Sequence, residues 1–384
     1  MRFELTDEQK EFQKTFRAFC EKEIAPRAHE IDVKGVFSPE NWKALAEYGY
    51  FRLPFPEKYG GYGADAVTCA IAWEELTRVC ASTALSAGAN ISLVTMPIFR
   101  FGTEDHKEKY LKKLITGEFI GSFCLTEPGC GSDAGGLKTT ARRENGKYIL
   151  NGTKMWISNA SFAKLAVIFA KTDKTKGAKG ITAFLVETDA PGFKSSLING
   201  KLGLRASAVC EISLENVEVP EENVLGEVGS GFKIAMSALE SGRYSVAAGC
   251  VGAAQGCLDA SIKYAKERVQ FGKPIGSFQL VQAMIAEMVV EIDAAHMLLM
   301  RAGHLKNKGR PNVLETCMAK LFASEMANRV AYKAIQIHGG YGFVDEFPVE
   351  RFYRDIRATT LYEGTSEIQK LIIGNLVLGL KAFV

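Results

Sequence analysis

One carboxylate near the C-terminal end of the chain stands where it could act as a base. The stretch TTLYEGTSEIQKLIIG, residues 359–374, places Glu363 directly before a glycine. Ser366 and Gln369 have the spacing of a capping box, and apolar residues follow at helical intervals. We therefore expect a helix from about Ser366, with Glu363 just outside its positive N-terminal end. A solvated acid near a helix start has the same pattern, and this stretch alone favours that interpretation.

A glycine-rich segment is the second candidate. EPGCGSDAGG, residues 127–136, nearly matches the dinucleotide fingerprint G-x-G-x-x-G/A. That fingerprint holds a pyrophosphate only between a strand and a helix, and the residues that follow here, LKTTARRENGKYIL, are β-like. A nicotinamide-binding βαβ unit is therefore disfavoured. What remains is a loop with Ser132 and accessible N–H groups, which either binds a ligand or forms a wide turn.

Three further segments carry residues suited to ligand contact, and each also has a structural interpretation. In MWISN, residues 155–159, Trp156 could cover a flat ring while Ser158 donates a hydrogen bond, although a strand Trp is more often core. ERVQFGKPIGSFQ, residues 267–279, reads as a connection between helices. QIHGGYGF, residues 336–343, is a glycine-rich break after a helix.

Composition narrows the class of protein. The 384 residues suggest two or three domains, and 47% of them are apolar. A net charge of +3 gives no indication of nucleic acid or an anionic membrane. The nine cysteines form no CxxC pair and do not cluster with the five histidines, so we expect reduced thiols and no zinc site. With neither a signal peptide nor an unbroken apolar run of membrane-spanning length, we expect a cytoplasmic protein without membrane insertion.

The pattern of apolar residues changes twice along the chain. Residues 1–118 read as helices, the first after a Thr6 N-cap. Residues 119–228 contain short runs rich in β-branched and aromatic residues, with tight-turn signals at Asn145-Gly146 and Asn151-Gly152, which suits a barrel or sandwich. Residues 229–384 carry long helices suited to an antiparallel bundle. The expected class is a multidomain α+β protein.

Five segments together resemble the acyl-CoA dehydrogenase family over nearly the full length of the chain. They are FCLTEPGCGSDAGG, KMWISN, ERVQFGKPIGSFQ, QIHGGYGF and LYEGTSEIQ, in the family's order. The resemblance implies an N-terminal helical domain, a middle β-barrel, a C-terminal four-helix bundle, bound FAD and a homotetramer. Electron-transfer flavoprotein would be the electron acceptor and an acyl-CoA the substrate.

The resemblance also implies roles for individual residues. Residues expected to contact FAD in the β domain are Phe123, Leu125, Thr126, Gly131, Ser132, Trp156, Ile157 and Ser158. Those expected to reach a neighbouring subunit's FAD are Arg268, Phe271, Gln279, Gln336, Ile337, His338, Gly339 and Gly340, while Thr365 and Glu367 lie at a helix start near the cofactor. Residues expected to bind the acyl-CoA are Ser132, Glu240, Arg243, Tyr362 and Gly364.

Glu363 matches the family's catalytic base. In some relatives the base comes instead from the residue before the arginine of the long bundle helix, and that position is Gly242 here. The implied reaction is α,β-dehydrogenation of an acyl-CoA to the trans-2-enoyl-CoA, with Glu363 taking the α-proton and flavin N5 the β-hydride. The alternatives are an oxygen-using acyl-CoA oxidase and a non-catalytic FAD- and acyl-CoA-binding assembly protein.

The sequence says less about which acyl group the substrate carries. By family analogy the helix around residues 86–97 forms the floor of the acyl pocket. Asn90, Ser92 and Thr95 add polarity there, which suits either core hydrogen bonding or a short, branched, cyclic or functionalised acyl group.

Overall fold

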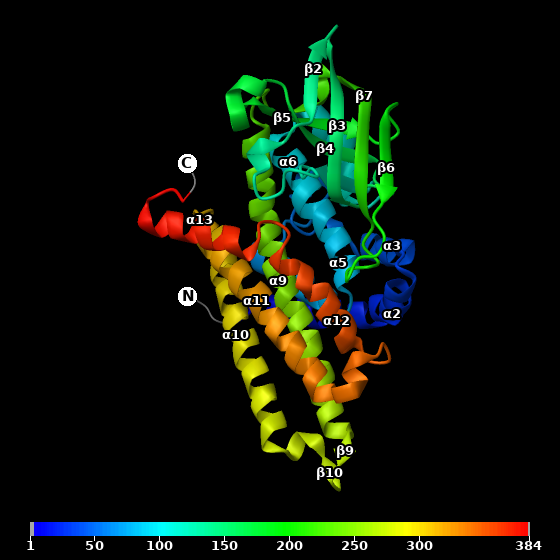
Figure 1. Ribbon diagram of the computed structural model, residues 1–384, viewed down its shortest axis with the longest axis vertical. Helices are drawn as coiled ribbons and strands as arrows, with labels where there is room; N and C mark the ends of the chain where they lie inside the picture. The colour runs from blue at the N-terminus through cyan, green and yellow to red at the C-terminus, as the bar shows by residue number, and fades with distance from the viewer. Residues whose placement is uncertain (1–3, 383–384) are drawn as a thin grey trace.

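The chain folds into helical, β and helical regions in sequence order, with the sheet at one end of an elongated molecule (Figure 1). The computed structural model describes residues 4–382. The predicted N-cap at Thr6 is confirmed, since its hydroxyl accepts from Gln9 N while the Gln9 side chain accepts from Thr6 N. The N-terminal α-helices are α1 (Asp7–Phe19), α2 (Ala25–Lys34), α3 (Pro39–Tyr48), α4 (Ala66–Thr77), α5 (Ala81–Gly88), α6 (Met96–Phe101), α7 (Glu104–His106) and α8 (Lys112–Ile115).

A long helical stretch, Ala81–Phe101, runs through the middle of the molecule. It joins α5 and α6 through the π-helical turn η4 (Ala89–Thr95). By length and composition it is apolar enough to cross a membrane, although Ser, Thr and Asn residues interrupt it. Its most apolar window is 72% buried inside the molecule, as expected for the core helix of a folded domain.

The β region is one curled sheet. Its order is β6-β7-β3-β2-β4-β5-β8, with β1 pairing to β4. Tyr148 of β3 and Phe184 of β5 have ring centroids only 5.1 Å apart although two strands separate them in that order, so the sheet closes on itself like a barrel. The strands are β1 (Gly121–Cys124), β2 (Thr140–Glu144), β3 (Lys147–Ser158), β4 (Leu165–Lys171), β5 (Ile181–Glu187), β6 (Phe193–Leu197), β7 (Val209–Pro220) and β8 (Val224–Leu225).

One of the two predicted tight turns is confirmed. Asn145 and Gly146 join β2 to β3 with φ of 49° and 76°, as a two-residue hairpin turn requires. The Asn151-Gly152 prediction is wrong, because both residues lie inside β3. The β3–β7 register shifts at Gly152, and a Cβ there would meet Thr139 Oγ1 at 2.5 Å, so this glycine marks a bulge under close backbone contact.

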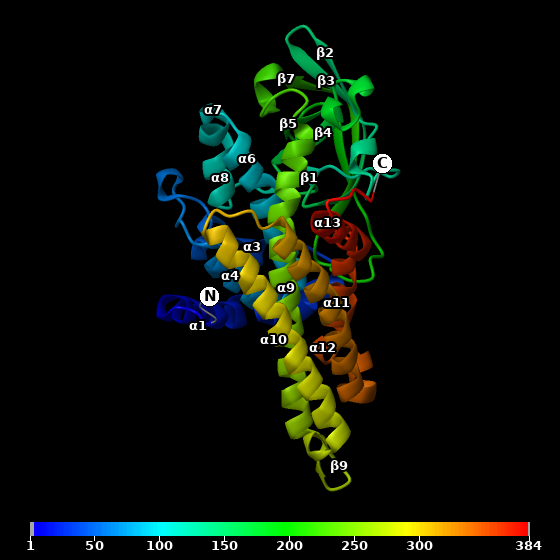
Figure 2. The ribbon, with the colours of Figure 1, turned by 90° about the vertical axis from the view of Figure 1, so that its left-hand side faces the viewer.

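Three long helices and two shorter ones form the C-terminal region. They are α9 (Gly231–Glu267), α10 (Gln279–Asn307), α11 (Val313–His338), α12 (Pro348–Ile356) and α13 (Ser366–Leu378). A small hairpin of β9 (Val269–Gln270) and β10 (Lys273–Pro274) connects α9 to α10 at the end remote from the sheet (Figures 1 and 2).

Helix α9 links the three regions. Its N-terminal residues Ile234 and Ala235 belong to the apolar core under the sheet, whereas residues from Tyr244 onward join the core shared with the N-terminal helices. Helix α4 packs so closely on α9 that a Cβ at Gly252 would lie 2.0 Å from Glu74 O. The glycines and alanines of α9 therefore permit the close helix contacts around the candidate site.

Candidate active site

Glu363 lies in a strained turn just before α13. Its φ is +54°, which is unusual for a residue with a side chain, and Gly364 follows at +89°. Helix α13 begins at Ser366 as predicted, but the cap is Thr365, whose hydroxyl accepts from Ile368 N at 3.3 Å. The predicted Ser366–Gln369 capping box is therefore wrong: the N-cap lies one residue earlier, and the Gln369 side chain donates to the carbonyls of Glu363 and Gly364 instead. Ser366 instead donates to Glu325 Oε1 at 2.5 Å.

Three side chains hold this turn in place. Arg243 Nε donates to Glu363 O at 3.2 Å, and Lys320 Nζ donates to Gly364 O at 2.8 Å. Gln369 Nε2 donates to both carbonyls, at 3.2 and 3.0 Å. Lys320 and Gln369 are fully buried, so these contacts are shielded from water. The clamp offsets the strain of the left-handed backbone and fixes the direction of the Glu363 side chain.

The Glu363 carboxylate is desolvated. Its Oε2 is buried and has no hydrogen-bond partner. Burial raises the pKa of Glu363 from 4.5 to about 8, although the charges of Arg243 and Lys320 act to lower it. An ionised oxygen without donors is a strong proton acceptor. Glu363 is therefore a buried acid and not a solvated surface acid, and a carboxylate in this setting can act as a general base.

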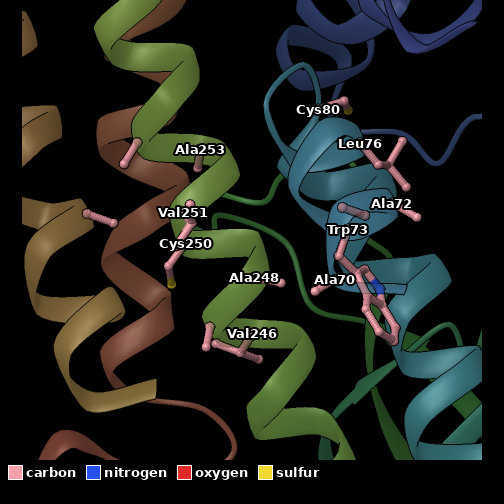
Figure 3. Close-up of a cluster of buried hydrophobic side chains, with 14 of the residues drawn as sticks. Ala70, Ala72, Trp73, Leu76, Cys80, Val246, Ala248, Cys250, Val251 and Ala253 are labelled. Atoms are coloured by element: carbon pink, nitrogen blue, oxygen red, sulfur yellow. The ribbon is translucent and has the colours of Figure 1, made fainter. Parts of the chain in front are cut away.

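Glu363 borders a narrow cavity with a volume of about 50 Å³. Helices α4, α5 and α9 supply most of its wall, and Figure 3 shows α4 with Trp73 beside α9 with Val246, Cys250 and Ala253. The exposed wall is mostly apolar. A flexible apolar chain with its reacting carbon near Glu363 suits this space.

The polar residues of the 86–97 segment serve the core. Asn90 Oδ1 accepts from Gly121 N at 2.8 Å, Ser92 contacts Ser245 Oγ at 3.4 Å, and Thr95 donates to Asn90 O at 2.7 Å. None of the three lines the cavity around Glu363. Of the two interpretations left open, core hydrogen bonding is the one that the structure supports. The cavity wall uses Gly88 and Ala89 from this segment instead.

Trp156 is exposed and not core. Trp156 has a φ of +62° and lies where the register between β3 and β7 shifts, and 60% of its surface is accessible. The next residue, Ile157, is buried in the sheet. Met155 N donates to Thr126 O at 2.9 Å, so the MWISN strand and the glycine-rich loop lie side by side. An unpacked indole beside Thr126 and Ser158 fits a flat ring system.

The glycine-rich loop has no helix after it. Only the short 3-10 turn η6 (Ala134–Gly136) follows, which confirms the rejection of a βαβ unit. A Cβ at Gly131 would meet nothing within 4 Å, and Ser132 is exposed, so this part of the loop is open. Beneath it, Lys154 Nζ donates to Glu127 Oε1 at 2.8 Å and to Leu125 O at 3.1 Å in a buried ion pair.

A second group of predicted residues gathers at the far end of the bundle. Arg268, Ile337, His338, Gly339 and Gly340 line one open depression there, away from the sheet (Figure 1). The adjacent Phe271, at the tip of the β9–β10 hairpin, is 92% exposed. Gln279 and Gln336 are exposed at the start of α10 and near the end of α11.

The remaining predicted residues have individual roles. Tyr362 lines the Glu363 cavity, and Glu367 is exposed in the first turn of α13. Glu240 pairs with Lys306 at 3.4 Å. Phe123 packs edge-on against Phe169 at 4.9 Å.

Sequence patterns missed three residues that shape the site. Lys320 stands between Ala319 and Leu321, and a single polar residue between apolar ones is a weak signal for a buried polar contact. Gln369 has the polar neighbours Glu367 and Lys370, and its spacing from Ser366 indicated a capping box instead. Trp73 sits in an apolar helix and reads as ordinary core. Only the fold brings all three toward Glu363.

Family models match all three regions of the chain. The acyl-CoA dehydrogenase N-terminal domain matches residues 6–118, the middle domain matches residues 122–217 and the C-terminal domain matches residues 229–378.

Individual relatives match over almost their whole length. A probable acyl-CoA dehydrogenase of Bacillus subtilis is 47% identical over 98% of this chain and 100% of its own. The structure of butyryl-CoA dehydrogenase from Megasphaera elsdenii superposes with a TM-score of 0.96 at 43% identity, covering 98% of this chain and 100% of that one. Glutaryl-CoA dehydrogenase from Mycobacterium smegmatis, in complex with FADH2, gives 0.95 at 33% identity, covering 99% and 97%.

The residues present fit the flavin cofactor. The exposed Trp156 indole offers a face for a ring, while Gly131, Gly339 and Gly340 leave open backbone where a side chain would meet nothing within 4 Å. FAD is the cofactor, as in homologous structures, and the enzyme is an oxidoreductase. With matching models in each region and relatives above 40% identity over nearly the full length, the chain belongs to the acyl-CoA dehydrogenase family.

Proposed function

We propose that Glu363 removes the α-proton of a bound acyl-CoA, giving the trans-2-enoyl-CoA. The observation that carries this proposal is its buried, unpartnered Oε2, bordering an apolar cavity with a pKa raised to about 8. A base whose pKa lies near the working pH abstracts protons best. The α-proton goes to this carboxylate as the C2–C3 double bond forms.

The turn also offers a donor for the thioester oxygen. Among the described residues, the backbone N–H of Glu363 makes no hydrogen bond, while its carbonyl is held by Arg243 and Gln369. A fixed N–H directed at the thioester oxygen would stabilise developing enolate charge, and losing one such donor typically costs about 3–4 kcal/mol. The clamp around Glu363 therefore orients both the base and this donor.

FAD, when bound, supplies the acceptor for the β-hydride. The segments that would hold its ring are the loop through Leu125, Thr126 and Ser132 and the strand through Trp156 and Ser158. Arg268, Phe271 and the segment 336–340 would contact the dinucleotide end of a neighbouring subunit's FAD, because they lie together at the opposite end of α9. This role requires an oligomer, which we infer to be a homotetramer.

We infer that the substrate is a short-chain, branched or cyclic acyl-CoA and that electron-transfer flavoprotein reoxidises the enzyme. Small residues and the bulky Trp73 and Tyr362 share the cavity wall, which suits a small acyl group. Peroxide production at the rate of substrate turnover in air would contradict the choice of acceptor and indicate an oxidase.

Glu363→Gln tests the proposed base directly. The variant keeps size and hydrogen-bonding atoms but cannot take the proton. We expect it to bind FAD and acyl-CoA as the wild type does and to lose nearly all reduction of the flavin, followed by its absorbance in a stopped-flow instrument. Bleaching at the wild-type rate would show that Glu363 is not the base.

A further inference from the structure

Trp73 lines the same cavity as Glu363 and has a buried polar atom without a partner. The residue is only 8% exposed, and its Nε1 is buried without a hydrogen-bond partner. Trp42, which is buried to a similar extent, donates its Nε1 to Gly117 O at 2.9 Å. Buried indole N–H groups normally find such an acceptor, so the unpaired one at Trp73 needs an explanation.

The indole occupies space that small residues leave open. A Cβ at Gly88 of α5 would lie 3.3 Å from Trp73 Nε1, and Gly88 also lines the cavity. The nearby wall includes the small side chains of Ala81 and Ala84 of α5 and Ala89 of η4, together with Leu85 of α5. A large ring on α4 thus fills the part of the cavity that α5 does not.

Trp73 and Glu363 line one cavity from different elements, α4 and the turn before α13. Thr77, one turn after Trp73 on α4, approaches α9 at Gly249, where a Cβ would lie 3.3 Å from the Thr77 hydroxyl. Glu363 meets α9 at Gly242. Seven residues of helix separate the two glycines, a rise of about 10 Å. The carbons beyond the reacting pair would therefore extend along the cavity that Trp73 also lines.

We propose that Trp73 determines acyl specificity, an inference that rests on the dehydrogenation proposed at Glu363. The ring limits the cavity to short acyl groups. Its N–H favours, among groups of equal length, those that carry an oxygen acceptor at the tail, because such an oxygen would satisfy the buried donor. The favoured substrates are short acyl-CoA thioesters with a hydroxyl or carbonyl oxygen at or near the end of the chain.

Two variants separate the roles of size and N–H. Trp73→Ala removes both the ring and the N–H. We expect the ratio of kcat/KM for hexanoyl-CoA to kcat/KM for butyryl-CoA to rise at least about tenfold, because one methylene in an apolar pocket usually changes kcat/KM by that much. Trp73→Phe keeps most of the ring and removes the donor. It should leave that ratio nearly unchanged. It should lower the ratio of kcat/KM for 4-hydroxybutyryl-CoA to kcat/KM for pentanoyl-CoA by about tenfold, because only the hydroxyl compound can accept from the N–H. The two acyl chains have equal numbers of heavy atoms.

Trp42→Phe is the matched control. It removes a paired indole N–H outside the cavity, so both ratios should stay at wild-type values. All variants are assayed as holoenzymes with an artificial electron acceptor and are checked for bound FAD. Should Trp73→Ala not fold, Trp73→Met, which also shortens the side chain, replaces it with the same expected direction.

The outcomes separate the two proposals. Wild-type enzyme that turns over none of the four thioesters and no branched or cyclic short-chain acyl-CoA would overturn the proposed function. Wild-type turnover with unchanged ratios in both Trp73 variants would leave that function standing and overturn the role of Trp73. A changed length ratio in Trp73→Phe equal to that in Trp73→Ala would assign the effect to general packing and contradict the separate role of the N–H.

Discussion

Gly242 leaves the space that the Glu363 carboxylate occupies. A Cβ at position 242 would lie 1.8 Å from Glu363 Oε2 and 2.4 Å from its Cδ, far inside van der Waals contact. Gly242 of α9 and Glu363 of the turn before α13 therefore meet at one point beside the cavity. Only one of them can carry a side chain there without displacing the other.

Gly242→Ala should disable the base without unfolding the protein. The added methyl must push the carboxylate aside, so we expect kcat to fall by about a hundredfold or more, as a displacement of about 1 Å of a reacting group can cause. FAD absorbance should be retained. Gly374→Ala in α13, where a Cβ meets nothing within 4 Å, is the control and should leave kcat unchanged.

The same contact predicts that the base can be supplied from α9. Glu363→Gly should lose turnover, and adding Gly242→Glu should restore part of it, because the new carboxylate starts from the position nearest the old one. Rates of flavin reduction in the single and double variants measure the rescue. No recovery in a double variant that still binds FAD and acyl-CoA would contradict the shared position of the two side chains.

The pH dependence follows from the raised pKa of Glu363. Its carboxyl must be ionised to accept a proton, so kcat/KM should rise with pH and level off above about 8. Stability should move the other way. Between its ordinary pKa of 4.5 and about 8, the folded protein keeps a proton that the unfolded chain has lost, so this group's contribution to stability falls as pH rises through that window.

Glu363→Gln isolates this contribution. Its stability relative to wild type should improve from pH 5 to pH 8, because glutamine carries no charge to desolvate. Denaturant midpoints of the two proteins across that range give the comparison. A constant difference would indicate that the Glu363 pKa is ordinary in the folded enzyme.

Lys320 lowers the pKa of Glu363, and removing it should shift the pH profile. Lys320 is fully buried, which lowers its own pKa, and its charge favours ionised Glu363. In Lys320→Met the midpoint of kcat/KM should therefore move to higher pH. Lys266→Met, on the exposed surface of α9, removes equal charge and should leave the midpoint unchanged. A purely structural role of Lys320 would lower the rate at every pH without moving the midpoint.

Local patterns predicted the elements well because each is fixed by neighbouring residues. The Thr6 cap and the Asn145-Gly146 turn both follow from contacts within a few residues. The Asn151-Gly152 signal failed because tertiary contact with Thr139 places that glycine inside a strand. An Asn-Gly pair occurs in tight turns and in bulged strands alike, and contacts with distant residues decide which of the two forms.

The site could be named only in part from sequence. Glu363 and Arg243 stand in recognisable motifs, but the clamp joins Lys320 of α11 to Gly364, and the cavity joins Trp73 of α4 to α9. These pairs lie tens to hundreds of residues apart, so no local spacing encodes them. Local spacing also left open whether Trp156 is core or exposed. That depends on whether other residues of the fold pack against its side of the strand.

Trp156 should contribute to FAD affinity and little to the stability of the apoprotein. With 60% of its surface exposed, its removal opens no cavity in the core. Trp156→Ala should raise the Kd for FAD, measured by titrating the apoprotein, while the unfolding midpoint without FAD stays close to wild type. Ile212→Ala, on the neighbouring strand β7 and fully buried, should do the opposite and lower the apoprotein midpoint.

The buried pair Lys154–Glu127 should hold the glycine-rich loop in its FAD-binding shape. Glu127 also accepts from Lys138 N, Thr139 N and the Thr139 hydroxyl, so its charge stays buried when Lys154 is lost. Lys154→Met should therefore destabilise the protein by about 3–5 kcal/mol. It also frees Leu125 O, and the loop should bind FAD more weakly.

The double variant Lys154→Met with Glu127→Gln tests the cause. It removes both charges, so the cost should be much less than that of Lys154→Met alone. Lys147→Met is the matched control on the same strand, because its pair with Glu218 at 2.5 Å is partly exposed and worth about 0–1 kcal/mol. Urea midpoints and FAD titrations of the four proteins separate the contributions. Equal losses in Lys154→Met and Lys147→Met would contradict an organising role for the buried pair, because burial is the property that distinguishes them.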